Sequence, residues 1–208
     1  MGSEVGTAVG TATGTVTIND NDPLMVSIND RTVTEGDGAS PAGDVAMTFT
    51  VSLDRVSEQT VTFDLATADL GIASARAGLD YTAVTQTVTF MAGSTTLSQP
   101  VTVTILPDAI NEAAETFNVN LSNLMFTNGM NPPAAPTDGS GFARAQGTGS
   151  IFDEDPLTIT IADSSVTEGD ATNVNMPFTV TTDIQSEQNI VLSYSSAAGT
   201  AALGTDFT

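Results

Sequence analysis

Cysteine, histidine, tryptophan and lysine are all absent from the 208 residues, and only two tyrosines are present. Without cysteine and histidine the chain can form no thiol nucleophile, no Ser-His triad and none of the usual zinc sites. The lack of cysteine also excludes a disulfide framework. Stability therefore has to come from packed cores, to which a bound metal could add.

Positive charge is nearly absent, since four arginines stand against 25 aspartates and glutamates and the net charge is −21. Such a surface repels phosphate backbones and anionic lipid headgroups, so nucleic acids and membrane surfaces are poor partners and cations are good ones. No hydrophobic run approaches the ~20 residues of a membrane span. The first ten residues, MGSEVGTAVG, show neither the basic nor the apolar region of a signal peptide.

Hydrophobic residues make up 40% of the chain, enough for a core, and they alternate with polar ones. Residues 47–53 (MTFTVSL) and 60–67 (TVTFDLAT) show this two-residue period, and similar segments follow, bounded by glycine, proline, asparagine or aspartate. No segment carries a convincing 3.6-residue pattern. Alternating strands with regular turn signals predict an all-β protein built from antiparallel sandwiches.

An internal repeat organises these strands. The segments TINDNDPLMVSINDRTVTEGD (17–37) and GSIFDEDPLTITIADSSVTEGD (149–170) share motifs in the same register. MTFTVSLD (47–54) likewise returns as MPFTVTTD (176–183), and GLDYT (78–82) returns as GTDFT (204–208). We therefore predict tandem seven-stranded antiparallel, immunoglobulin-like β-sandwiches, one complete and two partial.

The complete repeat is predicted to span residues 23–155, with strands at about 24–34, 45–53, 59–67, 81–91, 98–106, 115–123 and 145–153. Residues 1–22 are expected to form the last strand of a preceding repeat, and residues 156–208 to begin a third, truncated repeat. The Pro/Gly-rich connection 124–144 is long for a sandwich, and we expect it to be disordered or variable.

Acidic residues gather at one predicted end of the complete sandwich. Successive strands alternate in direction, so every second connection lies at the same end. The acids in those connections and after the last strand are Glu35, Asp37, Asp80, Asp108, Glu112, Glu115, Asp153, Glu154 and Asp155. The opposite end has only three acids, Asp54, Glu58 and Asp138, with Arg55 and Arg144 beside them.

This many carboxylates cannot all stay ionised together without compensation, because a like-charge pair 4 Å apart costs about 4 kcal/mol at an effective dielectric constant of about 20. A cation would relieve the repulsion. Oxygen ligands without imidazole or thiolate select a hard ion, and irregular loops favour Ca²⁺ over Mg²⁺. The alternative is that these are solvated acidic loop tips, which are common on acidic proteins.

These motifs resemble the Calx-beta domain. The resemblance is carried by VTEGD, GLDYT, VTFMAGSTTLSQPVTVTILPDAINEAAETFNVNLSN and GSIFDEDP, which occur in fixed order. The family occurs in cytosolic regulatory domains of sodium–calcium exchangers, in an integrin beta subunit and in many bacterial surface proteins. The resemblance implies a seven-stranded sandwich that binds Ca²⁺ at its distal loops.

The resemblance also implies a set of calcium ligands in this chain. The side-chain positions fall on Glu35, Asp80, Asp108, Glu112, Glu115, Asp153, Glu154 and Asp155, and a main-chain carbonyl position falls on Ile110. The chain departs from the exchanger pattern at Pro107, which replaces an acid and offers no side-chain oxygen. We therefore expect one to three ions rather than four.

The function predicted is that of a non-catalytic, calcium-binding structural or adhesive repeat of a large surface or secreted protein, located outside the cell or at its surface. Expected partners are calcium ions, the neighbouring repeats, and a protein or glycan target. The alternative is a calcium-sensing regulatory domain of a membrane transporter. A glycosidase is disfavoured because a loop tip offers no walled, aromatic-lined pocket, and threonine-rich strands are ordinary β-sheet chemistry rather than evidence of ice binding.

Overall fold

The computed structural model describes residues 22–36, 38, 41, 43–71, 74–128, 132–170 and 173–208. All regular secondary structure in these residues is β, which confirms the predicted fold class. No helix in the described residues is long and apolar enough to cross a membrane. The strand predicted in residues 1–22 falls almost wholly outside the described part of the chain.

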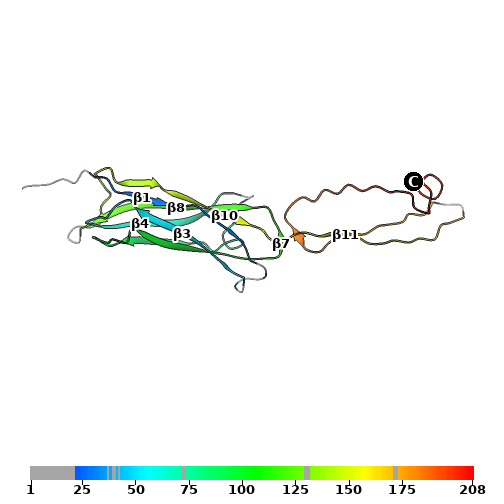
Figure 1. Cartoon of the computed structure of the whole chain (residues 1–208), viewed down its shortest axis with the longest axis horizontal. Helices are drawn as coiled ribbons and strands as arrows, with labels where there is room; N and C mark the ends of the chain where they lie inside the picture. The colour runs from blue at the N-terminus through cyan, green and yellow to red at the C-terminus, as the bar shows by residue number, and fades with distance from the viewer. Residues whose placement is uncertain are drawn as a thin grey trace, which may run out of the picture.

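Two sheets pack face to face between residues 24 and 152 and form the sandwich in the left half of Figure 1. The strands of the first sheet are, in order, β6 (Ser98–Ile105), β3 (Val45–Leu53), β1 (Met25–Ile28) and β9 (Gly141–Arg144). Those of the second are β2 (Arg31–Thr34), β10 (Gln146–Phe152), β8 (Glu115–Thr127), β4 (Thr60–Asp69) and β5 (Thr85–Phe90).

The first predicted strand divides between the two sheets, as β1 and β2. The last predicted strand is β10, and β9 before it forms within the predicted connection 124–144. Both β1·β9 and β2·β10 are parallel pairs. The side chain of Asp30, at the break between β1 and β2, accepts a hydrogen bond from the amide of Thr148 (2.8 Å) and pairs with Arg144. The sequence predicted antiparallel pairing throughout, and within the described sandwich these two parallel pairs are the difference.

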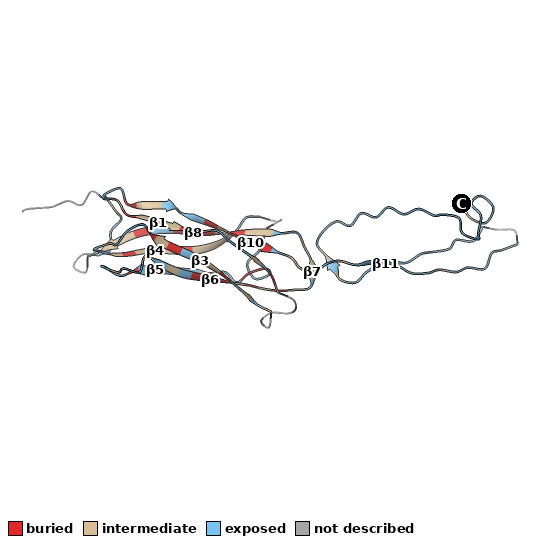
Figure 2. Ribbon diagram, viewed as in Figure 1, coloured by how far each residue is buried: buried red, intermediate tan, exposed pale blue. Residues whose placement is uncertain are grey.

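The alternating side chains of both sheets meet in one core. In β3 every second residue, Met47, Phe49, Val51 and Leu53, is buried, as the two-residue period predicts. Burying a large apolar side chain contributes roughly 1.5–3 kcal/mol. Figure 2 shows the buried residues concentrated in the sandwich, whereas residues 156–208 are almost entirely exposed.

The long connection before β9 is partly ordered. β8 continues to Thr127, beyond the predicted strand end at 123, and Phe126 and Ala134 exchange two backbone hydrogen bonds of 2.8 and 3.0 Å. Phe142 packs edge-on against Phe63, with ring centroids 6.1 Å apart. The prediction of disorder was therefore wrong for these described residues, because aromatic side chains anchor the connection to the sandwich.

Residues 156–208 form an open loop that extends from one end of the sandwich (Figure 1). It contains β11 (Ile159–Ile161), paired with β12 (Val180–Thr182), and β13 (Gln185–Ser186), paired with β7 (Ile110–Asn111) of the preceding sandwich. Its hydrogen bonds repeat those of the sandwich. The amide of Thr158 donates to Asp183 Oδ1 (2.7 Å), as Met25 donates to Asp54 (2.9 Å).

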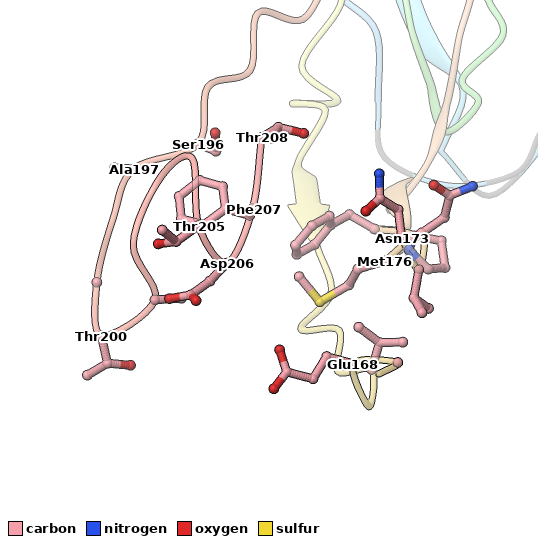
Figure 3. A pocket seen from close by; sticks show the side chains of 18 residues that line it. Glu168, Asn173, Met176, Ser196, Ala197, Thr200, Thr205, Asp206, Phe207 and Thr208 are labelled. Carbon is pink, nitrogen blue, oxygen red and sulfur yellow. The ribbon is translucent and has the colours of Figure 1, made fainter. Parts of the chain in front are cut away.

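A hollow lies between the two sides of this loop, lined by Glu168, Met176, Phe178, Asp206 and Phe207 among others (Figure 3). In the complete sandwich the residues matching Met176, Phe178 and Phe207 are fully buried core residues. The apolar side chains that line the hollow are therefore counterparts of core residues in the complete sandwich. This exposed apolar lining does not define a ligand site.

Candidate metal centre

The predicted acidic residues lie at the end of the sandwich next to β7 (Figure 1). Glu35 directly follows β2, and Asp80 lies between β4 and β5. The segment between β6 and β8 supplies Asp108, Ile110 and Glu112, and Glu115 is the first residue of β8. The chain after β10 supplies Asp153, Glu154 and Asp155. The structure thus brings the nine predicted residues to one end, whereas Asp37 lies outside the described residues.

Three of these carboxylates form a tight group. One oxygen each from Asp80, Glu112 and Glu115 lies within 4.8 Å of the others. Asp80 Oδ2 accepts a hydrogen bond from the amide of Arg76 (2.6 Å), and the Asp80 carbonyl accepts one from Leu106 (3.0 Å). The first bond closes a turn within the connection between β4 and β5, and the second ties that connection to the segment after β6.

The core anchors this group through the residue that follows Asp80. Tyr81 is fully buried and stacks on Phe117, with ring centroids 4.2 Å apart. Its hydroxyl donates to Asp69 Oδ1 at 2.5 Å, so the polar end of the ring is satisfied. A packed aromatic ring therefore holds Asp80 at the edge of the core.

Glu35 is the most buried acid of the site, with 6% of its surface exposed. Its amide donates to the carbonyl of Phe152 (3.0 Å), which fixes it beside β10. Gly36 must lack a side chain, because a Cβ there would lie 2.4 Å from the carbonyl oxygen of Gly43. The TEG motif thus lets the chain turn closely while Glu35 points into the site.

Burial and like charges raise the pKa values of three carboxyl groups. Desolvation, followed by the charges of Glu112, Asp108, Glu154 and Asp153, raises the pKa of Glu35 to about 8. Desolvation, followed by Asp108 and Asp80, raises the pKa of Glu112 to about 8. The pKa of Glu115 rises to about 7 through desolvation, the charge of Asp80 and a hydrogen bond with it.

Asp153 links the end of β10 to the segment around β7. Its Oδ2 accepts hydrogen bonds from the amide of Glu112 (3.1 Å) and from Asn111 Nδ2 (3.2 Å), and its Oδ1 accepts one from the amide of Asp155 (3.0 Å). Asp108 Oδ1 accepts from the amide of Ile110 (2.7 Å). The bonds from Glu112 and Asn111 join the two segments, and the other two close local turns.

The acids at the opposite end of the sandwich are separate and locally satisfied. Asp54 accepts from the amide of Met25 and pairs with Arg55 at 3.4 Å. Two hydrogen bonds from Ser140, backbone first and hydroxyl second, lower the pKa of Asp138. Glu58 is exposed. Among the described residues of the sandwich, the tight group of carboxylates therefore lies at the end next to β7.

The residues of the crowded end fit a hard divalent cation. The side-chain atoms that could bind a metal are carboxylate oxygens. Both carboxylate oxygens of Glu154 and Oδ2 of Asp155 are shielded from solvent. A buried carboxylate such as Glu35 that is faced by four others needs either a proton or a cation. Oxygen-only coordination by loops is the chemistry of Ca²⁺ sites.

Sequence reasoning missed two features of this end. Asn111 lies between Asp153 and the following segment, and Glu187, from that following segment, acts electrostatically on Glu112 and Glu115. The signal available was the triplet Ser-Glu-Gln, which occurs at 57–59 and again at 186–188. The same turn forms at both places, since the glutamine amide donates to the serine Oγ in each.

Fold and site together define a β-sandwich protein with a carboxylate-rich candidate cation centre at one end. The family model for the Calx-beta domain matches residues 19–140 and 153–208. Because these matches cover most of the chain, it belongs to the Calx-beta domain family.

Several solved structures are similar to the chain. The apo-form Calx CBD1 domain is 19% identical, with a TM-score of 0.46, and the match covers 64% of this chain and 100% of that one. CBD12 from CALX1.2 is 20% identical with a TM-score of 0.47, and the calcium binding domain CBD12 of CALX1.1 is 21% identical with a TM-score of 0.44. Each of these two matches covers 65% of this chain, which spans about half (49%) of the CBD12 chain. No curated protein matches the chain.

Proposed function

We propose that the chain is a non-catalytic calcium-binding repeat unit of a larger surface or secreted protein, in which Ca²⁺ stiffens the junction between repeats. The observation that carries the proposal is Glu35, a carboxylate with 6% exposure that faces four other acids. Burying an uncompensated carboxylate is costly, and a bound cation removes that cost. Membership of the Calx-beta family supports the same ion.

The ligands proposed are the eight acidic residues at the end next to β7 together with the carbonyl of Ile110. Asp80, Glu112 and Glu115 form the group whose oxygens are closest together. Glu35, Asp108 and Asp153 surround it, and Glu154 and Asp155 close the side after β10. A cation held there would draw four separate segments of the sandwich together.

The position of the site supports a role at the junction between repeats. Pro156 follows Asp155 directly, and β13 of the next segment pairs with β7 beside the acids. An ion at this place would restrict movement between successive sandwiches. Extracellular modules typically bind Ca²⁺ with dissociation constants of about 10⁻⁴–10⁻³ M, so even a weak site fills at the millimolar calcium levels outside cells.

A calcium-sensing regulatory domain of a membrane transporter is the second candidate, and it uses the same site. The direct joining of one repeat to the next favours the structural role, because it makes the ion part of the connection. Dissociation constants well below 10⁻⁵ M would favour the sensor, since sensors respond to intracellular calcium.

Calorimetric titration of the 208-residue chain tests the site. Asp108→Asn and Asp153→Asn each remove one charged ligand and should weaken Ca²⁺ binding at least tenfold, about 1.4 kcal/mol. Asp54→Asn and Glu58→Gln remove the same charge from the opposite end and should change the affinity little. The Debye length of about 8 Å at physiological salt is far shorter than the sandwich, so diffuse charge cannot produce this difference. Equal losses in all four variants would contradict the assignment.

A further inference from the structure

The segment after β12 docks on the sandwich through a small, fully hydrogen-bonded contact. β13 pairs in parallel with β7, and the amide of Glu187 donates to the carbonyl of Asn111 (3.1 Å). Gln188 Nε2 donates to the carbonyl of Glu112 (2.7 Å). The sandwich and the following segment therefore meet at β7, directly beside the acidic residues.

Asn111 connects the two sides of this contact. Both hydrogens of its amide group are used, since Nδ2 donates to Asp153 Oδ2 (3.2 Å) and to the carbonyl of Asp155 (3.0 Å). Its Oδ1 accepts from Ser186 Oγ (3.1 Å) and from Gln188 Nε2 (3.5 Å). The side chain thus makes the four hydrogen bonds available to a carboxamide. An aspartate here would lose both donors and add a charge next to Asp153.

The docked triplet has a counterpart in the complete repeat. Ser186-Glu187-Gln188 follows β12, and Ser57-Glu58-Gln59 follows the equivalent strand β3. Both form the same turn, in which the glutamine amide donates to the serine Oγ at 3.1 Å. Glu58 and Gln59 are exposed at the end of the sandwich away from β7.

We propose that this Ser-Glu-Gln turn is the element by which each repeat docks onto β7 of the repeat before it. The partner of Ser57-Glu58-Gln59 is then the β7 segment of a preceding Calx-beta repeat, with a residue equivalent to Asn111 as its acceptor. The docked glutamate lies close enough to act on Glu112 and Glu115, so it adds negative charge to the cation site from outside the sandwich.

This placement makes docking and cation binding mutually favourable. Without a cation, Glu187 is repelled by Glu112 and Glu115, which opposes docking. With a divalent cation in the site, the same carboxylate is attracted. Coupling of this kind is reciprocal. The cation raises the equilibrium constant for docking by some factor, and docking raises the affinity for the cation by the same factor. The cation dependence rests on the proposed function, whereas the docking contact does not.

Hydrogen exchange on the full 208-residue chain, with and without Ca²⁺, tests the contact at the Glu187 amide. Gln188→Leu removes the bond to the Glu112 carbonyl and should lower protection of that amide at least tenfold. Gln59→Leu, the same change in the undocked turn, is the matched control and should leave it unchanged. Gln185→Val makes the docked segment identical to residues 56–59 and should preserve protection. Loss of protection in Gln185→Val would overturn the proposal that the turn of the complete repeat can dock.

Titration with CaCl₂ tests the coupling. Glu187→Gln should weaken Ca²⁺ binding about 3- to 10-fold, because one nearby charge is removed, and Glu58→Gln should not. Calcium binding with an unprotected Glu187 amide would overturn the docking inference and leave the proposed function standing. The Glu187 amide could instead be protected, and lose its protection in Gln188→Leu, while the chain binds no calcium. That result would support docking and contradict the proposed function.

Discussion

At the scale of single residues, carboxyl groups behave differently inside and outside the crowded end of the sandwich. Asp30 and Asp138 accept hydrogen bonds that lower their pKa values, with Arg144 the leading cause for Asp30 and the Ser140 amide for Asp138. Glu35 has no such leading donor, and desolvation followed by like charges raises its pKa to about 8. The site therefore stores repulsion that a cation can relieve.

This difference predicts how the metal-free stability depends on pH. The unperturbed value for glutamate is 4.5, and the folded values for Glu35 and Glu112 are about 8. Between these values the folded state binds more protons than the unfolded state, so the free energy of unfolding falls as pH rises from about 5 to 8. Carboxyl groups whose pKa is lowered in the folded state change the free energy of unfolding only at pH values below this window. Urea denaturation in a chelator at several pH values measures the slope.

Calcium and Glu35→Gln are the controls for this pH dependence. Saturating Ca²⁺ should flatten the slope, because bound carboxylates stay ionised in the folded state. Glu35→Gln should reduce it without calcium, since one titrating group is removed. A metal-free stability that rises with pH over this window would contradict the burial of ionisable groups in the site.

At the scale of the strand, β10 shows how the core positions the site. A Cβ added at Gly149 would lie 2.5 Å from Phe117 Cζ and 2.9 Å from Met47 Sδ. The strand therefore lies against the core without a side chain at this position. It then delivers Asp153 to the end of the sandwich a few residues later.

Gly149→Ala should destabilise the sandwich by about 1–3 kcal/mol through overpacking. Gly141→Ala in β9 is the matched control, because nothing lies within 4 Å of its added Cβ, and it should change stability by less than about 0.5 kcal/mol. Thermal melting in saturating Ca²⁺ compares the two variants. Equal effects would mean that β10 does not approach the core as closely as described.

At the scale of the whole molecule, calcium should stabilise the sandwich but leave much of residues 156–208 unprotected. A single site at a free ion concentration 100 times its dissociation constant adds about 2.7 kcal/mol. Melting of the full chain in millimolar Ca²⁺, compared with a chelator and with Mg²⁺ as control, measures this. An unchanged midpoint in Ca²⁺ would remove the basis for the calcium site.

Most of the open loop formed by residues 156–208 should exchange its amide hydrogens rapidly, in contrast to the docked Glu187 amide. Val191 is 89% exposed and Tyr194 is 98% exposed, and neither lies in a strand. The amides of residues 190–195 should therefore exchange rapidly even when the Glu187 amide is protected. Slow exchange in 190–195 would mean that this segment pairs with another strand in solution, for example in a second copy of the chain.

The sequence alone was sufficient for the all-β class and for strands that rest on a clear local alternation. The strand predicted at 45–53 is β3 with the same bounds, and the end of the sandwich that gathers acids follows from the alternating direction of strands. These predictions succeed because the period of two and the order of turns are properties of short segments. The repeat boundaries and the individual calcium ligands stay predictions.

Only the tertiary structure decided how distant segments meet. The first strand changes sheets where Asp30 meets Thr148, and Asn111 joins Asp153 to Ser186. No local pattern marks such residues, because their partners are far away in the sequence and the contacts exist only once both sheets have packed. Glu35 is likewise an ordinary loop acid in the sequence, and it is buried in the structure, where the next residue, Gly36, packs against the carbonyl of Gly43.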